Sequence, residues 1–394
     1  MTLPYYISWA KQKEVSTFPI LKVEGAKVFT TNNRPIIDMS SISYQAHFGH
    51  NHPIIINKIK EQLDTIPMSS PKGVYPYKDE TTKKLLKYMG KEEGKVFYTT
   101  GGAETIENAL KIARDVTGKR IVLARQNSYH GATLGALSVT GDWRNPAHQT
   151  PTDWVVRIPE PDSENAISKT REIILKTNPE HIAAIILETI TGGNGVIIPS
   201  QNWYIGIQNL CNEFKILLIL DEVVCGFHRT GKPFAYQHYN NLNPDMICLA
   251  KGITGGMIPF GAVWTSKTIS LHYEDTILCC GLTNYAHPLG VAALSGVLEI
   301  LHDKSFQDNL SQVESLFMHE LEKIKSLPIV KAIRVHGMLC AIDLQKTVEW
   351  KKFFEKGIYL VAQTNRIILA PPLIIDDKTL IEGMLKITET LKEA

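Results

Sequence analysis

The chain has 394 residues, 44% of them hydrophobic and 21% charged, a balance typical of an ordered protein with one large core and a smaller companion domain. Its 42 basic and 40 acidic residues leave a net charge of +2 without long runs of one sign, so neither nucleic acid nor an anionic membrane is indicated as a partner. The N-terminal residues lack the apolar core of a signal peptide, and no apolar run approaches the ~20 residues that span a bilayer, so we expect no membrane association.

The first 90 residues contain strand-like and then helix-like segments. Residues 20–41 alternate short apolar runs with Gly and Asn-Asn turn signals, which predicts a small antiparallel meander. Apolar residues at helical spacing follow Pro53 and predict one helix. The segment ETTKKLLKYM predicts a second helix that ends at Gly90.

Strands and helices alternate between residues 95 and 265. Strand-like runs are KVFYTT, RIVLA, AAIILE, ILLILD and MICLA, and helices are expected at 103–117 and near 203–214. This alternation is typical of a βαβ series, in which helices flank a mostly parallel sheet.

The pattern changes again beyond residue 290. Two helices, GVAALSGVLEILHD and SQVESLFMHELEKIKSL, precede strands in KAIRVHGMLCAIDL and RIILAPP and a closing helix. We therefore predict an α/β protein, with a large domain at 51–295 and a small α+β domain at 296–394. The N-terminal segment 1–50 is expected to contribute to the small domain.

Two of the predicted strands end in opposite charges. Asp221 lies in LLILDEVVCGFHRTG, and Lys251 lies in DMICLAKGITGG. Ligands bind beyond the carboxyl ends of strands in open α/β sheets, so this acid and this lysine can meet around one small molecule. Pyridoxal phosphate needs a lysine that bonds to its aldehyde and a carboxylate that keeps its pyridine nitrogen protonated. We predict this cofactor, with Lys251 and Asp221 as the catalytic residues.

Three further segments are candidates for the same site. Gly101 and Gly102 separate a strand from a helix, which suits either a phosphate or a plain turn. Tyr129 follows a strand and is either a ring that stacks on a heterocycle or part of a surface turn. Glu188 ends another apolar run and is either a second acid of the site or a strand-end carboxylate.

Other chemistries fit the sequence less well. GFHRTGK at 226–232 nearly completes a phosphate-binding loop of nucleotide hydrolases, but Pro233 follows it and the loop comes after the Asp strand. His47, His50 and His52 lack a fourth ligand for zinc, and we expect no metal. The six cysteines show no CxxC spacing, which suits a reducing compartment and a cytoplasmic protein.

The motifs around these residues carry a resemblance. The span from Asp221 through Arg229 and Asp245 to Lys251 and Gly255-Gly256, together with GGAETIENALKIAR, SYHG, GLTNYAHPLG and NRIILAPPL, resembles the class III aminotransferases. These are pyridoxal-phosphate enzymes of fold type I. The likeness runs from about residue 18 to the C-terminus and is greatest for the branch with taurine-pyruvate and related ω-aminotransferases.

The resemblance implies a role for each candidate residue. Lys251 would bond to the cofactor, and Asp221 would pair with its ring nitrogen. Thr283 would reach the phosphate of a neighbouring subunit, which implies a homodimer. The remaining cofactor-binding residues would be Gly101, Gly102, Ala103, Tyr129, His130, Glu188 and Val223. Tyr44 and Arg366 are the substrate-binding candidates, Arg366 because a guanidinium binds carboxylates or sulfonates in a bidentate manner.

The implied reaction moves an amino group from an ω-amino acid or another primary amine to a 2-oxo acid in ping-pong order. Other chemistry on the same cofactor, such as that of an aminomutase, epimerase or decarboxylase, is the alternative, and a cofactor-binding protein without activity is a third possibility. Three departures from the family pattern bear on this choice. They are Ala103 in place of a Ser or Thr, Val224 in place of a frequent Gln, and the altered segment 284–286.

Overall fold

A seven-stranded sheet forms the centre of the computed structural model, which describes residues 3–70 and 72–394. Its strands, in spatial order, are β4 (Lys95–Thr99), β10 (Gly261–Thr265), β9 (Met246–Leu249), β8 (Leu217–Asp221), β7 (Ile182–Glu188), β5 (Ile121–Arg125) and β6 (Val155–Ile158). β10 runs antiparallel to β4 and β9, and the pairs from β9 to β6 are parallel. The predicted mostly parallel sheet is confirmed.

Helices cover both faces of this sheet, which explains why its central strands β7, β8 and β9 are apolar along nearly their whole length. Alternate residues of β7 belong to two separate apolar clusters, Ile185 to one and Ile186 to the other. The cluster of Ile186 contains Ile106 of α4 (Gly102–Thr117), and the cluster of Ile185 contains Ile207 of α7 (Gln201–Phe214). The other helices of this region are α5 (Leu134–Val139), α6 (Ala166–Thr177) and α8 (Lys267–Asp275).

The sequence analysis missed two strands of this sheet, the edge strand β6 and the strand β10. β10 is the longer of the two. Its five residues are all buried and carry no alternation, so periodicity did not separate it from the preceding segment. Only residues 250–260 connect β9 to β10. That is short for a parallel crossover, which needs a dozen or more residues, and the chain returns antiparallel instead.

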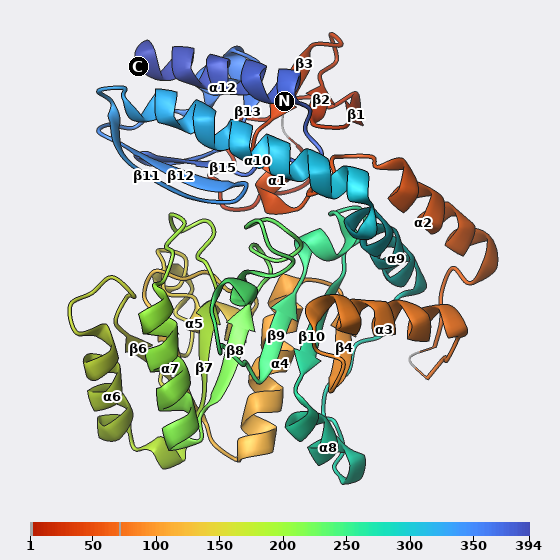
Figure 1. Ribbon diagram of the computed structural model, residues 1–394, viewed down its shortest axis with the longest axis vertical. Coiled ribbons are helices and arrows are strands. Elements are labelled where there is room, and N and C mark those ends of the chain that lie inside the picture. The colour runs from red at the N-terminus through yellow and green to blue at the C-terminus, as the bar shows by residue number, and fades with distance from the viewer. Residues whose placement is uncertain (1–2, 71) are drawn as a thin grey trace.

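Two four-stranded sheets form a second layer above the large sheet (Figure 1). One contains β1 (Lys22–Glu24), β2 (Lys27–Phe29), β3 (Pro35–Asp38) and β13 (Ile358–Tyr359), and the other contains β11 (Val330–His336), β12 (Leu339–Leu344), β15 (Arg366–Leu369) and β14 (Val361–Gln363). The long helices α10 (Lys304–Lys325) and α12 (Asp377–Lys392) lie in this layer, with the short α11 (Trp350–Glu355). The predicted meander is confirmed. β3 pairs with β13, so this part of the N-terminal region shares a sheet with the C-terminal region.

The remaining helices connect and flank the two layers. They are α1 (Ser41–Tyr44), α2 (Pro53–Thr65), α3 (Pro76–Met89), α9 (Pro288–His302) and the 3₁₀ turns η1 (Pro146–His148), η2 (Pro179–His181), η3 (Ala235–His238) and η4 (Lys251–Thr254). Gly90 ends α3 with a φ of +64°, as predicted. The domain boundaries at residues 50 and 295 stay a prediction, and α9 runs across the second of them. No helix in the described part of the chain combines the length and apolar character needed to cross a membrane.

Candidate active site

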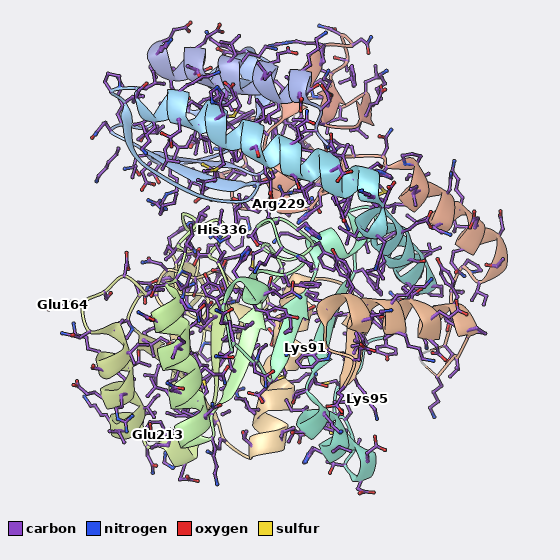
Figure 2. All side chains as sticks on the ribbon, in the orientation of Figure 1. Lys91, Lys95, Glu164, Glu213, Arg229 and His336 are labelled. Carbon is purple, nitrogen blue, oxygen red and sulfur yellow. The ribbon has the colours of Figure 1, made fainter. Side chains whose placement is uncertain are left out.

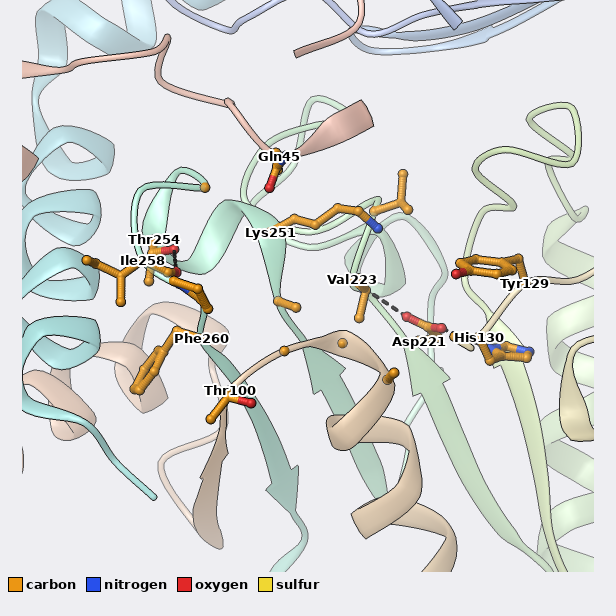
Figure 3. Close-up of a pocket in the computed structure, with 18 of the residues that line it drawn as sticks. Gln45, Thr100, Tyr129, His130, Asp221, Val223, Lys251, Thr254, Ile258 and Phe260 are labelled. Carbon is orange, nitrogen blue, oxygen red and sulfur yellow. Dashed lines mark hydrogen bonds and ion pairs between the residues drawn. The ribbon is translucent and has the colours of Figure 1, made fainter. Parts of the chain in front are cut away.

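A cavity of about 330 Å³ lies beyond the carboxyl ends of β8 and β9 (Figure 3). It brings together most of the residues that the sequence analysis selected, namely Gly101, Gly102, Ala103, Tyr129, His130, Glu188, Asp221, Val223 and Lys251. Gln45, Thr254 and Phe260 also line it and were not predicted. Gln45 and Phe260 come from segments without a strand-end signal, and Thr254 follows Lys251 by three residues but carries no charge that would have singled it out. The volume is within the range of small-molecule sites, roughly 300 to 1,000 Å³.

Lys251 is the only lysine among the residues that line this cavity within the described chain. It follows β9 directly, begins η4, and has a φ of +46°. Its Nζ lies 6.0 Å from the centre of the Tyr44 ring. Burial lowers the pKa of the Lys251 ammonium, and the Asp221 and Glu188 carboxylates oppose that shift. The site therefore favours the neutral amine more than water does.

Asp221 is held in the cavity wall by two hydrogen bonds. The backbone N–H of Val223 donates to Oδ1 (3.0 Å), and Nδ1 of His130 lies 2.8 Å from Oδ2. Since the carboxylate accepts, Nδ1 of the His130 imidazole donates this hydrogen bond. Nε2 is buried and has no hydrogen-bond partner within the described residues.

Glu188 lies beside Asp221, because β7 and β8 pair these two residues in register. Its carboxylate accepts the backbone N–H groups of Tyr129 (3.0 Å) and Gly192 (2.9 Å). Burial raises the pKa of Glu188, and His130 opposes the shift. Glu188 therefore fixes the backbone of Tyr129 and also lines the cavity.

The turn between β4 and α4 forms the floor of the cavity at residues 100–103. A Cβ on Gly102 would lie 3.1 Å from a methyl group of Val223, so glycine lets this turn approach β8. Gly131 has a φ of +137°, and a Cβ there would lie 2.8 Å from that of Ala103. The first-turn N–H groups and the dipole of α4 make this end favourable for a phosphate.

These features fit pyridoxal phosphate. The cavity offers a lysine with a lowered pKa, a buried carboxylate fixed by a neighbouring imidazole, an aromatic ring, and a glycine turn at a helix N-terminus. Lys251 and Asp221 project toward the same space, with Tyr129 beside them (Figure 3).

Three predicted residues lie away from the floor of the cavity. Tyr44 has a buried hydroxyl without a partner among the described residues, and its ring faces Lys251. Arg366 lines a separate outer cavity of about 910 Å³ and is paired with Asp343. Thr283 is exposed on the connection between α8 and α9, so its predicted contact with a second subunit stays a prediction.

Arg144 is a candidate that the sequence analysis did not select. Its guanidinium carbon lies 4.7 Å from the ring centre of Tyr129, 4.8 Å from that of Trp143 and 5.2 Å from that of Trp9. It pairs through Nη1 with Asp142, while Nε has no partner among the described residues. Arg144 lines the outer cavity and also contacts the ring of a cofactor-site residue. The one feature of the local sequence that could have indicated this site is the neighbouring Trp143, whose ring can contact a guanidinium.

Two residues of the rejected chemistries, Arg229 and His50, have structural partners, whereas neither ring nitrogen of His47 has a hydrogen-bond partner among the described residues. Arg229 donates to the carbonyls of Met338 (3.1 Å) and Pro371 (2.6 Å) and lies between the two layers (Figure 2). His50 lies 3.0 Å from Asp38. Among residues 3–70 and 72–394, no group of three or more His, Cys, Asp or Glu side chains is arranged to hold a metal ion.

Comparison with known proteins agrees with this geometry. The family model described as aminotransferase class-III matches residues 8–391. The chain is 29% identical to an acetylornithine aminotransferase of Methanopyrus kandleri, over 96% of this chain and 95% of that protein. The structure of taurine:2-oxoglutarate aminotransferase from Bifidobacterium kashiwanohense, in complex with PLP and glutamate, is 30% identical with a TM-score of 0.93 and covers 98% of this chain and 95% of that one. An S-selective transaminase from Bacillus megaterium is 25% identical, with a TM-score of 0.92 over 99% of this chain and 96% of that one. The chain belongs to the class III aminotransferase family, whose members transfer amino groups with pyridoxal phosphate.

Proposed function

We propose that this aminotransferase takes its amino group from a primary amine that carries a terminal carboxylate or sulfonate, and passes it to a 2-oxo acid in ping-pong order. The observation that carries the choice of donor is the position of Arg144, between the cofactor-site residue Tyr129 and the outer cavity. The taurine:2-oxoglutarate aminotransferase of similar structure supports the same class of donor.

In this proposal the residues of the cavity hold the cofactor. Lys251 bonds to it covalently, and Asp221 pairs with its ring nitrogen while His130 keeps the carboxylate in place. Gly101, Gly102 and Ala103 bind the phosphate through backbone N–H groups, and Tyr129 and Val223 pack against the ring. When bound, pyridoxal phosphate supplies the electron sink that lets the amino group leave the donor.

Lys251 is also the proposed proton carrier. To act in this way, the free Nζ of Lys251 would have to be neutral, so that it could accept a proton from the donor carbon. Burial lowers the pKa of Lys251 in the required direction, since desolvation penalises the ammonium. The neighbouring acids Asp221 and Glu188 limit the shift and keep the amine basic enough to take the proton.

Arg144 is the proposed site for the substrate anion. Its guanidinium is in contact with the rings of Trp9, Tyr129 and Trp143, so little side-chain freedom is lost when it binds an anion. Asp142 accepts a hydrogen bond from Nη1 of Arg144, and Nε has no partner among the described residues, so Nε can donate to a substrate anion. Arg366 is less suited, because Asp343 and the carbonyl of Asn194 already accept from it.

A homodimer in the cytoplasm completes the proposal. Thr283 is exposed and outside the cavity of its own chain, a position that suits contact with the phosphate of a partner subunit. The six cysteines, all within the described residues, are free thiols, which suits a reducing compartment.

Titration of the visible cofactor band with amines tests the proposal. Taurine, β-alanine and 4-aminobutyrate should bleach the band, and a 2-oxo acid should restore it. We expect Lys251→Ala to abolish both the band and turnover. Arg144→Gln should raise the KM for these anionic donors about 10- to 100-fold, the range for one or two charge-assisted hydrogen bonds, without changing the KM for propylamine.

Arg120→Gln is the matched control, because Arg120 pairs with Asp153 on the exposed surface. An equal loss for propylamine and taurine in Arg144→Gln would assign Arg144 to folding instead of anion binding. A band that persists in Lys251→Ala would exclude Lys251 as the covalent residue.

A further inference from the structure

An acidic residue of the upper antiparallel sheet lies between two arginines. Asp343 is on β12, directly opposite Arg366 of β15, and Arg334 lies on the other neighbouring strand, β11. Nε of Arg366 donates to Oδ1 of Asp343, and Nη1 of Arg334 donates to Oδ2 (2.8 Å). We call these three residues the arginine clamp.

One further donor group of each arginine reaches the same loop of the large domain. Nη1 of Arg366 donates to the carbonyl of Asn194 (3.2 Å), and Nε of Arg334 donates to the carbonyl of Gly195 (2.6 Å). Gly195 has a φ of +110°, and a Cβ there would lie 2.6 Å from Cζ of Arg366. The loop backbone is therefore in close contact with the guanidinium, an approach that requires glycine.

The same loop contacts the active site on its other side. The N–H of Gly192 donates to Glu188, which lines the cofactor cavity. Nδ2 of Asn194 donates to Oδ2 of Asp142 (3.3 Å), and this same oxygen pairs with Arg144. A continuous set of hydrogen bonds thus links Asp343 to the proposed anion site.

We propose that Asp343 is a positioning residue for substrate binding, which acts through the arginine clamp and Asn194 to orient Asp142 and Arg144. The inference deepens the proposed function and rests on the role given there to Arg144. Asp343 sets the directions of both arginines, and the arginines hold the loop by two charge-assisted hydrogen bonds.

The charge of Asp343 is constant under assay conditions. Burial alone would raise the pKa of this carboxyl, but hydrogen bonds from Arg334 and Arg366 outweigh it and lower the pKa to about 2. Any effect of the clamp on KM should therefore be independent of pH between 6 and 9.

Asp343→Asn is the test variant, because the amide keeps the shape but cannot accept from both arginines. We expect the KM for taurine or β-alanine to rise about tenfold, as for the loss of one charge-assisted hydrogen bond, with kcat, the KM for propylamine and the cofactor band unchanged. In an Asn194→Ala background, Asp343→Asn should add little, because the side-chain link to Asp142 is already absent.

Glu213→Gln is the matched control, since Glu213 of α7 pairs with Arg171 of α6 on the exposed surface of the large domain, at the end away from the upper layer (Figure 2). A KM that stays the same or falls in Asp343→Asn overturns the inference, and a fall is the result expected if the freed Arg366 binds substrate itself. A rise of equal size for propylamine overturns it too. If Asp343→Asn does not fold, Gly195→Ala displaces Arg366 from the loop and is measured with the same substrates.

Arg144→Gln, measured in parallel, separates this inference from the proposed function. If Arg144→Gln raises the KM and Asp343→Asn does not, only the clamp is wrong. If Arg144→Gln has no effect, the proposed anion site is wrong, and the inference that depends on it is wrong as well.

Discussion

Some residues of the cavity matter because they have no side chain, which lets neighbouring segments of the chain lie close together. The floor of the site is compact because Gly131 adopts a φ of +137° and leaves the space next to Ala103 that a side chain would occupy. Ala103 replaces the Ser or Thr expected from the family pattern. In the proposed function the N-terminus of α4 would therefore bind the phosphate through its backbone N–H groups alone.

A side chain at position 131 should disrupt the packing of this residue against Ala103. Gly131→Ala places a Cβ 2.8 Å from that of Ala103 at a positive φ. We expect a loss of unfolding free energy of about 3 kcal/mol, from backbone strain plus steric overlap, and weaker cofactor binding. Denaturant unfolding and titration of the apoenzyme with pyridoxal phosphate measure the two effects.

Gly118→Ala is the control, since Gly118 also has a positive φ of +65°, but no atom of the described residues lies within 4 Å of the position that a Cβ would take there. It should cost about 1 kcal/mol from backbone strain alone, without a change in cofactor affinity. Equal costs for the two variants would contradict the steric explanation.

At the level of elements, the short α1 decides where Tyr44 lies. All four of its residues have a positive φ, so this turn is left-handed and strained. Asp38 stabilises it, because its carboxylate accepts the backbone N–H groups of Ser40 (2.9 Å) and Ile42 (2.8 Å) and pairs with His50. The turn presents the ring of Tyr44 to Lys251.

Removal of the Asp38 carboxylate should release this turn. We expect Asp38→Ala to lower the unfolding free energy by about 3 kcal/mol, since a buried carboxylate with three partners is lost and His50 loses its partner. Substrate KM should rise as Tyr44 loses its fixed position. Urea unfolding and steady-state kinetics provide the two measurements.

Asp153→Ala removes an exposed partner of Arg120 and should change the unfolding free energy by less than about 0.5 kcal/mol. A similarly small change in Asp38→Ala would mean that packing, and not the carboxylate, maintains the left-handed turn.

At the level of the whole molecule, buried polar groups join the two layers. Arg229 links the large domain to the carbonyls of Met338 and Pro371, and burial lowers its pKa to about 9. A second contact joins His238 of the large domain to His336 of β11, with ring centres 4.2 Å apart. Both imidazoles donate to the carbonyl of Thr230. Figure 2 shows His336 and Arg229 between the layers.

A fall in pH should weaken the contact between the two layers at His238. Burial, with smaller contributions from His336 and Lys232, lowers the pKa of His238 to about 4, below its ordinary value of 6.5. The unfolded chain binds the proton first, so the stabilisation is complete above pH 6.5 and is lost as the pH falls toward 4. His238→Gln keeps a donor without titrating. We expect the Tm difference between wild type and His238→Gln to shift in favour of the variant over this interval.

The Tm difference between wild type and His238→Gln separates the effect of His238 from that of groups whose contribution to stability changes with pH in the opposite direction. Burial raises the pKa of Glu222 to about 7, so its contribution decreases as the pH rises from 4.5 to 7 in both proteins. His181→Gln, at an exposed position, is the control and should follow wild type. A constant difference between His238→Gln and wild type would rule out titration of this contact.

Local patterns were sufficient for five strands of the large sheet and for the residues that lie together at the carboxyl ends of β7 and β8 and just beyond β9. Buried strands that end in Asp221 and Lys251 must meet at one edge of a parallel sheet, because all their carboxyl ends point the same way. For the same reason Glu188 lies beside Asp221, and the glycine turn before α4 opens into the same cavity. The fold class and the class III aminotransferase assignment were both confirmed.

Only the tertiary structure decided which side chains surround that centre. Arg366 pairs with Asp343 across two strands, and Arg144 is enclosed by aromatic rings from residues as distant in sequence as Trp9 and Tyr129. Periodicity reports which face of an element is buried, but not which distant segment covers it. Strand order, the antiparallel return of β10 and the left-handed turn of α1 set these contacts, and they arise when the whole chain packs.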